Sequence, residues 1–272
     1  METDRSPGNA GGHEPDAQPS LGAAIDGLLG RLPPELARGI RLGAIPHRFD
    51  ADLLALLLGD GANAGPVTHE MRRLHLLRET APGRLAYHDH VRSHLLAGLQ
   101  NQPEIYRQAS ARAAEYYRAR WARQRTPDAR GDLLECVYHR LAADEATGLL
   151  ELRGAFDGFI RAAEFGLAER LLDYAGEQQA VLSQRGQHWL RALGAQLRQA
   201  GPQQEAGESI FGELASEAGD PLLRAVARRS LAELLAQQWQ WASSLDELQA
   251  ALRAFGELGD EREIANTQAT LG

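Results

Sequence analysis

The stretch ALRAFGELGDEREIANTQATLG (251–272) repeats a pattern that lies forty residues earlier in the chain. Glu257–Asp260 aligns with Glu217–Asp220, and Ala265 aligns with Ala225. Between the two Gly-Asp pairs, apolar residues recur at helical spacing. A period of this length is typical of repeat proteins, in which short helical units stack on their neighbours and share a core. The C-terminal part of the chain therefore predicts an α-solenoid.

The repeated pattern resembles the tetratricopeptide arrays in which ALxxxxxLGD is followed by a spaced Ala and Leu-Gly. Thr126-Pro127 is a helix start signal, and we expect glycines to break the following helices, at Gly131, Gly148, Gly154, Gly166, Gly176, Gly201, Gly219 and Gly259. We therefore predict tetratricopeptide-like helical repeats over residues 126–272. The pattern ends inside the first helix of a further unit, whose apolar face would lack a partner. We accordingly expect a chain that is truncated at its C-terminus, a fragment of a longer open reading frame.

The N-terminal part begins with a segment that carries no periodicity. Residues 1–20 are rich in Gly, Pro, Asp and Asn, and we predict a disordered tail. Ser20 is placed to cap a short helix, and Pro33-Pro34 suit the first turn of a second one. Asp50 is placed to cap a third helix over ADLLALLL (51–58).

A short β-hairpin is predicted in the middle of the N-terminal part. Val67, Met71, Leu74 and Leu77 recur at helical spacing and predict a helix before it. Pro82-Gly83 then forms a turn between apolar residues, which is typical of a hairpin. Further helices are expected at about 89–100 and 103–123. Three helices followed by a hairpin is winged-helix order, so we predict a winged-helix domain with trailing helices over residues 21–125. The predicted fold class is all-α, an α-solenoid with a small winged-helix domain that contains a short β-hairpin.

The composition excludes several classes of enzyme. The chain contains no lysine, so it lacks the lysine of a phosphate-binding P-loop and the amine of a Schiff-base enzyme. Cys136 is the only cysteine, which fits a reducing compartment. Neither a hydrophobic signal core nor an apolar run of membrane-spanning length is present. We therefore expect a cytoplasmic protein that is not an enzyme, takes no cofactor and has no membrane partner.

Several segments together resemble one family. They are LPPELARGIRLGAIPHRFDADLLALLL (32–58), AYHDHVRSHLLAGL (86–99), YRQASARAAEYYRAR (106–120) and ECVYHRLAADE (135–145). Together they resemble the region downstream of the nucleotide-binding domain in signal-transduction ATPases with numerous domains, a class with apoptotic-type ATPases and bacterial tetratricopeptide regulators. The nucleotide-binding domain itself is absent. The resemblance implies a non-catalytic regulatory module, in which a winged helix couples to helical repeats that bind a protein or peptide, and it allows an ATPase domain supplied in trans as a second partner.

The triplet Tyr87-His88-Asp89 is the sharpest point of this resemblance. The family has a Met-His-Asp triplet there, whose histidine contacts the β-phosphate of bound ADP. The resemblance implies that His88 senses a nucleotide, provided that an ATPase domain is supplied in trans, and that Asp89 caps a helix. The alternative for His88 is a half-buried histidine at a strand–helix junction without a ligand. A carboxylate at Asp89 would meet the positive end of the helix dipole in either case.

The alternative function is a winged-helix DNA-binding transcriptional regulator with a helical effector domain. Residues 67–130 carry twelve arginines against six acids, although the whole chain has a net charge of -8. The helix expected over THEMRRLHLLR (68–78) would enter the major groove, with Arg72, Arg73 and Arg78 as candidate nucleic-acid contacts. That segment contains no Asn or Gln for adenine readout, so DNA is the less favoured partner.

Other constellations are better explained by packing than by chemistry. His90 and His94 have the i,i+4 spacing of metal ligands, but no third ligand is evident, and no metal site is predicted. Cys136 and His139 have i,i+3 spacing without an orienting group, and Cys136 lies in an apolar pattern, so we predict a core cysteine. The aromatic pairs Tyr116-Tyr117 with Trp121, and Trp239 with Trp241, are expected to pack between helices.

Overall fold

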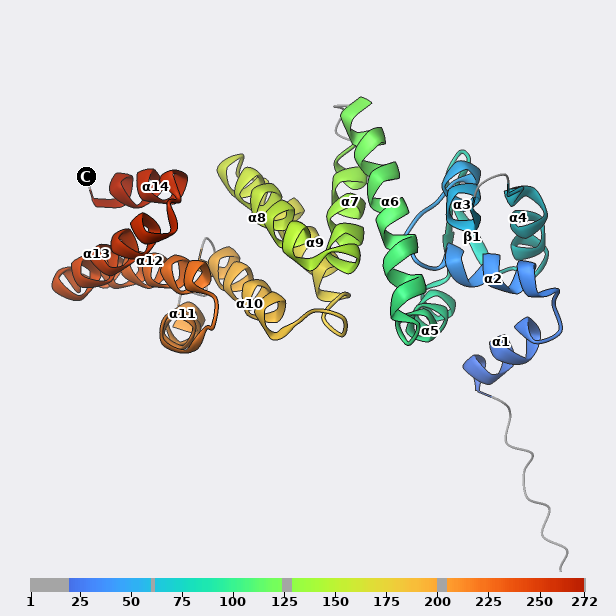
Figure 1. Cartoon of the computed structure of the whole chain (residues 1–272), viewed down its shortest axis with the longest axis horizontal. Helices are drawn as coiled ribbons and strands as arrows, with labels where there is room; N and C mark the ends of the chain where they lie inside the picture. The colour runs from blue at the N-terminus through green and yellow to red at the C-terminus, as the bar shows by residue number, and fades with distance from the viewer. Residues whose placement is uncertain (1–19, 60–61, 124–128, 200–204, 272) are drawn as a thin grey trace, which may run out of the picture.

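The computed structural model describes residues 20–59, 62–123, 129–199 and 205–271. Over these ranges the chain forms helices and one two-stranded antiparallel sheet, arranged along an elongated molecule (Figure 1). The predicted fold class, an α-solenoid with a short hairpin, is confirmed in this part of the chain. The tail expected at residues 1–20, apart from Ser20, lies outside the described residues, as do Thr126-Pro127 and Gly201.

The first helices begin where the sequence places their caps. They are α1 (Leu21–Leu29), α2 (Pro34–Gly43), α3 (Ala51–Leu58) and α4 (Ala64–Arg73). The Ser20 hydroxyl accepts a hydrogen bond from the N–H of Ala23, and an Asp50 oxygen accepts one from the N–H of Leu53 at 3.0 Å. These side chains satisfy N–H groups that have no partner inside the helix, so both predicted caps are confirmed.

The predicted hairpin is also present. It consists of β1 (Leu77–Ala81) and β2 (Arg84–Tyr87), joined at Pro82-Gly83, where Gly83 has a positive φ of 74°. Phe49, just before α3, forms an isolated antiparallel bridge with Leu85 of β2. The bridge consists of two backbone hydrogen bonds of 2.9 and 2.8 Å. The backbone at Phe49 thus pairs with the free edge of β2.

The helix before the hairpin is shorter than the sequence pattern predicts. It ends at Arg73, whereas the apolar spacing extended it to Leu77. His75 adopts a left-handed φ of 51°, and the N–H of Leu76 donates to the carbonyl of Met71 at 3.1 Å. This geometry closes the helix end by satisfying one of its last carbonyls. Leu77 is instead the first residue of β1, where it pairs with Tyr87 of β2. This pairing satisfies its backbone groups in place of a further turn of helix.

The remaining helices follow in an unbroken series through the rest of the described chain. They are α5 (Asp89–Gln100), α6 (Pro103–Arg123), α7 (Arg130–Ala143), α8 (Glu145–Arg161), α9 (Phe165–Gly176), α10 (Gln184–Gln199), α11 (Glu205–Glu217), α12 (Pro221–Gln237), α13 (Trp241–Leu258) and α14 (Glu261–Leu271). The breaks expected at Gly131, Gly148, Gly154 and Gly166 are wrong, since all four lie inside helices.

Gly148 has a packing reason to be glycine. A Cβ atom at this position would lie 2.6 Å from the backbone of Leu141. Helices α7 and α8 therefore approach so closely that no larger residue fits between them. The sequence shows the glycine, but only the tertiary packing separates a helix break from a close contact.

The forty-residue repeat corresponds to two equivalent turns. Gly219-Asp220 lies between α11 and α12, and Gly259-Asp260 lies between α13 and α14. Asp220 accepts a hydrogen bond from the N–H of Leu222 at 3.0 Å, and Asp260 accepts one from the N–H of Glu263 at 3.1 Å. The same residue type thus caps the helix that follows each of the two turns.

Helix α7 belongs to both hydrophobic clusters of the structure. Its Cys136 packs with residues of α1–α6, whereas its Leu134 and Val137 pack with residues of α8–α13. Helix α6 lies along α7, across the boundary predicted at residue 125. None of the described helices is both long and apolar enough to cross a membrane.

The prediction that Trp239 and Trp241 pack between helices is wrong. Their exposed fractions are 78% and 59%, and their rings meet edge to face at 5.7 Å. Trp239 lies in the turn before α13 and has a positive φ of 64°. Tyr117 is buried as expected, while Trp121 is 38% exposed at the end of α6.

Candidate functional site

Every second helix of the repeat region lines one groove. Residues of α8, α10, α12 and α14 enclose a volume of about 430 Å³. Figure 1 shows α14 and α8 on the upper side of the molecule, with α12 and α10 below them. We call this hollow the repeat groove. Eight of its lining side chains are polar, namely Asp157, Arg161, Gln196, Gln199, Arg229, Glu233, Gln237 and Asn266.

Ion pairs hold α14 against the groove. Arg262 of α14 lies 2.7 Å from Asp157 of α8. Glu263 of α14 is buried, and it pairs with Arg153 of α8 at 3.1 Å and with Arg229 of α12. A buried carboxylate with two guanidinium partners is held in a defined geometry. The shape of the repeat groove therefore depends on α14.

One of the four amide side chains in the groove is hydrogen-bonded to a neighbouring helix. Gln196 donates to the Ser230 hydroxyl at 3.0 Å. The side chains of Gln199, Gln237 and Asn266 make no hydrogen bond with any other described residue. Each amide offers a carbonyl acceptor and an NH₂ donor, which is the pair of groups that a peptide bond requires. The groove thus presents unpaired donors and acceptors beside the apolar side chains of its lining.

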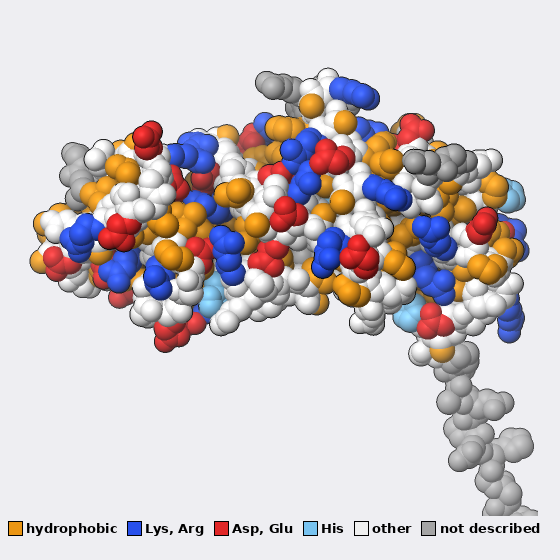
Figure 2. Space-filling view, in the orientation of Figure 1, with side chains coloured by type: hydrophobic (Ala, Val, Ile, Leu, Met, Phe, Trp, Pro, Cys, Tyr) orange, Lys and Arg blue, Asp and Glu red, His pale blue; other side chains and the backbone are white. Residues whose placement is uncertain are grey.

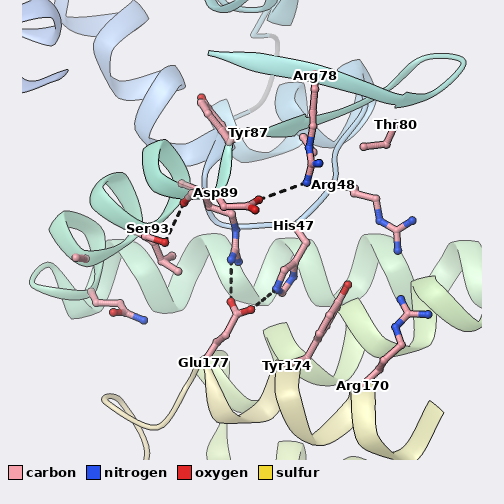
Figure 3. Close-up of a pocket in the computed structure, with 15 residues that line it drawn as sticks. His47, Arg48, Arg78, Thr80, Tyr87, Asp89, Ser93, Arg170, Tyr174 and Glu177 are labelled. Carbon is pink, nitrogen blue, oxygen red and sulfur yellow. Dashed lines mark hydrogen bonds and ion pairs between the residues drawn. The ribbon is translucent and has the colours of Figure 1, made fainter. Parts of the chain in front are cut away.

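A second pocket lies where the hairpin region meets α9. It has a volume of about 670 Å³ and is lined by the loop before α3, the hairpin, α5 and α9 (Figure 3). We call it the junction pocket. Four of its lining residues are arginines, namely Arg48, Arg78, Arg92 and Arg170. Its acidic lining residues are Asp89 and Glu177.

His47 and Glu177 form the centre of a polar network beside the junction pocket. The His47 ring lies 3.2 Å from Glu135 through Nδ1 and 3.0 Å from Glu177 through Nε2. Arg92 donates to Glu177 at 2.7 Å and to the Tyr138 hydroxyl at 3.0 Å. These contacts join the loop before α3 to α5, α7 and α9, as Figure 3 shows in part.

The carboxylates control the protonation of this network. Burial lowers the pKa of His47, but the charges and hydrogen bonds of Glu135 and Glu177 outweigh burial and raise it above its ordinary value. Burial raises the pKa of Glu177, but His47 and Arg92 outweigh this effect and bring it down to about 2. His139, fully buried beside Glu135, has its pKa lowered, chiefly by burial. The network therefore favours a charged His47 between two charged carboxylates.

The sequence-predicted residues do not gather in one place. His88 is exposed just before α5 and does not line the junction pocket, although its backbone N–H donates to the carbonyl of Leu76 at 3.2 Å. The half-buried alternative for its side chain is therefore wrong. Asp89 is the first residue of α5 and not its cap, because the cap position belongs to His88, which makes no side-chain capping bond. The Asp89 carboxylate instead pairs with Arg78 at 3.3 Å.

The candidate nucleic-acid contacts lie on two different elements. Arg72 and Arg73 are exposed in the last turn of α4, whereas Arg78 lies on β1 and not on the helix. Arg73 donates two hydrogen bonds to Glu70, of 2.8 and 2.5 Å. Over the face seen in Figure 2, basic and acidic side chains are interspersed.

The residues considered for other chemistry have structural partners. Cys136 is buried, as predicted, and burial raises the pKa of its thiol to about 11. His94 lies 3.0 Å from Asp26 of α1. The described residues contain no group of three or more side chains arranged to hold a metal ion.

Sequence reasoning did not single out the residues of the network and of the groove. His47 follows Pro46 in a short loop, and nothing in its local sequence signals a contact with a helix more than a hundred residues later. The glutamines of the groove were also unremarkable singly. The feature that links them is their position on alternate helices of the repeat region, and this can be recognised only once the bounds of the helices are known.

Comparison with known proteins does not assign the chain to a family. No family model and no curated protein sequence matches it. A solved structure that resembles it is a signal transduction ATPase with numerous domains, with a tetratricopeptide repeat sensor, from Pyrococcus horikoshii. The two share 12% identity with a TM-score of 0.33, over 94% of this chain and 51% of that one. This chain thus spans about half the length of that protein, and a likeness this loose establishes neither family nor function.

Proposed function

We propose that this chain is a non-catalytic interaction and regulatory module, whose helical repeats bind an extended polypeptide segment of a partner protein in the repeat groove. The unpaired amides of Gln199, Gln237 and Asn266 carry this proposal. They lie on α10, α12 and α14 and face one hollow, so that their donors and acceptors follow its course. An extended peptide presents carbonyl and N–H groups at regular intervals and would satisfy them.

The chemistry of the groove also limits the side chains of the partner. Arg161 and Arg229 lie among the lining residues together with Glu233, whose pKa is raised chiefly by its burial. Phe156 and Ile160 supply apolar surface next to them. We expect a peptide with a mixed sequence, in which main-chain hydrogen bonds give affinity and a few side chains give selectivity.

Selection from a random peptide library tests this function. The whole chain is immobilised, and peptides of about twelve residues displayed on phage are selected against it. The matched variant is Gln199→Ala combined with Asn266→Ala, which removes two amides from the groove. As a control, Glu208→Gln changes an acid of α11 that lies outside the groove lining. The proposal expects peptides that bind the wild type and the control with equal affinity and bind the groove variant about tenfold more weakly, a loss that fits one or two hydrogen bonds. Peptides that bind all three proteins alike, or an empty selection, would overturn it.

The N-terminal region is the regulatory half of the proposal. The helices α2–α4 followed by the hairpin have winged-helix order, and the Phe49–Leu85 bridge adds the short edge of such a domain. The polar network around His47 joins this region to α9 and gives it a route to the repeats. In this proposal an ATPase domain supplied in trans would contact the exposed His88. The test measures whether this chain associates with such an ATPase domain in the presence of nucleotide. Association that His88→Ala abolishes supports this role, and association that His88→Ala leaves unchanged contradicts it.

A DNA-binding regulator is the second candidate, and the exposed Arg72 and Arg73 on the helix before the hairpin favour it. Binding through phosphate contacts weakens steeply as salt rises. The full chain is therefore titrated onto a duplex of about 30 base pairs at low and at physiological salt. Retention that Arg72→Ala with Arg73→Ala abolishes supports DNA binding. The absence of a shifted band at low salt rules this candidate out.

A further inference from the structure

Two guanidinium groups face one another across the junction pocket. Arg48 lies in the loop before α3 and Arg170 lies on α9, and Figure 3 shows their charged ends directed toward each other. Neither forms an ion pair with a carboxylate of the described residues, whereas Arg78 pairs with Asp89 and Arg92 pairs with Glu177. Like charges that face each other repel, so the arrangement is suited to an anion that lies between them.

The charge balance of the junction pocket points the same way. Four arginines line it against two carboxylates, which leaves two positive charges before His47 is counted. The whole chain has a net charge of -8, so the positive charge of this pocket is opposite in sign to that of the chain. Low-dielectric walls around such a pocket concentrate anions from solution. An anion with two negative charges would neutralise the excess.

The dimensions of the pocket indicate more than a bare ion. Its volume of about 670 Å³ is that of a small-molecule site. Ala86, Leu96 and Ala97 give it apolar surface, and Thr80 also lines it, with its hydroxyl donating to the carbonyl of Arg84. Tyr174 stacks on His47 with ring centroids 3.9 Å apart and forms part of the lining beside Arg170. The pocket therefore combines a charged end with a wall suited to a small organic group.

We propose that the junction pocket binds a small molecule that carries a phosphate group, with Arg48 and Arg170 as its two anchors. A phosphate monoester carries close to two negative charges at neutral pH and accepts the paired N–H groups of guanidinium. Arg48 belongs to the hairpin region and Arg170 to the repeats, so the ligand would bridge the two parts of the chain. This site is separate from the repeat groove and from His88, and it stands whether or not the groove binds a peptide.

Thermal unfolding of the full chain tests the site. The probes are inorganic phosphate and phenyl phosphate, titrated up to about 20 mM at constant ionic strength with chloride as the reference anion. The test variant is Arg48→Ala combined with Arg170→Ala, and the control is Arg107→Ala, an exposed arginine of α6 outside the pocket. Circular dichroism of each variant verifies that it is folded.

The proposal expects a rise in Tm that saturates with at least one probe, since a ligand that binds only the folded state stabilises it. It expects the control to behave as the wild type and the double variant to bind at least about tenfold more weakly, because two charge-assisted contacts are removed. Tighter binding of phenyl phosphate than of inorganic phosphate identifies an organic phosphate as the ligand class, and equal binding identifies free phosphate. A Tm that neither probe changes, or a change that the double variant retains in full, overturns the proposal.

Discussion

His47 and Glu177 are 130 residues apart in sequence and 3.0 Å apart in space. The histidine lies in the loop before α3, and the glutamate follows the last residue of α9. This contact connects the N-terminal region, which contains the hairpin, to α9 of the helical repeats. It also lies at the edge of the junction pocket, so the same pair contributes to stability and to the shape of a candidate site.

Replacing Glu177 with Gln is expected to weaken this junction. The variant keeps the size of the side chain but removes its charge, which both His47 and Arg92 contact. Because the carboxylate is partly exposed and screened by solvent, we expect a loss of about 1 kcal/mol in the free energy of unfolding. Urea denaturation measures it, with Glu104→Gln as the control for an exposed pair on one helix. In a double-mutant cycle with His47→Gln the two losses should be less than additive, and full additivity would contradict the pairing.

The pKa of His47 gives the stability of the chain a defined pH dependence. Its pKa is higher in the folded state than its ordinary value of 6.5, despite its burial, because Glu135 and Glu177 favour the protonated ring. Folding therefore binds a proton more tightly, and the contribution is fully present below pH 6.5 and is lost as the pH rises through the folded pKa. The carboxylates limit it on the acid side, since the stability contributed by Glu177 declines as the pH falls from its ordinary pKa of 4.5 toward about 2.

The measurement compares wild type with His47→Gln by urea denaturation across this pH range. The difference in unfolding free energy should be largest at about pH 4.5 to 6.5, the interval between the ordinary pKa values of Glu and His, and should shrink above it. A difference that grows from pH 6 to pH 9 would show that the sign is wrong and that the histidine is neutral in the folded state.

Two glycines of α8 should respond to alanine in opposite directions. A Cβ at Gly148 would lie 2.6 Å from the backbone of Leu141, whereas a Cβ at Gly154 would meet nothing within 4 Å. We expect Gly148→Ala to destabilise the fold by about 1–3 kcal/mol through overpacking between α7 and α8. Gly154→Ala should stabilise it by about 0.5–1 kcal/mol, because alanine has the higher helix propensity. Thermal unfolding of both variants checks the pair, and equal effects would refute the close approach of the two helices.

Glu263 is expected to control whether α14 stays in place. Its carboxylate is buried between Arg153 and Arg229, so Glu263→Ala removes the carboxylate partner of Arg153 and leaves Arg229 with only Glu233, at 3.7 Å. Breaking such a buried arrangement typically costs about 3–5 kcal/mol. Amide hydrogen exchange should therefore accelerate in α14 and along the facing side of α8, while α2–α5 keep their protection. The matched variant Glu261→Ala, on the exposed side of α14, should leave the exchange pattern as it is.

Local signals in the sequence predicted much of the helical structure. Ser20, Asp50 and the Pro82-Gly83 turn act within three or four residues of themselves, so their effect was readable without knowledge of the fold. The period of forty residues likewise located the turns at Gly219 and Gly259. The end of α4, by contrast, was mispredicted because apolar spacing continues past Arg73 while strand pairing competes for Leu77.

By itself, then, the sequence determined the class of the protein: an array of capped helices with a repeat, a hairpin, and no lysine for P-loop chemistry. Tertiary structure alone decided which side chains come together: it brings His47 to Glu177, places Arg48 and Arg170 in the lining of one pocket, and places the amides of alternate helices in one groove. The physical reason is the range of the interactions. Caps, turns and helical periodicity depend on neighbours within one or two turns, whereas a charge pair or a groove depends on how whole helices pack.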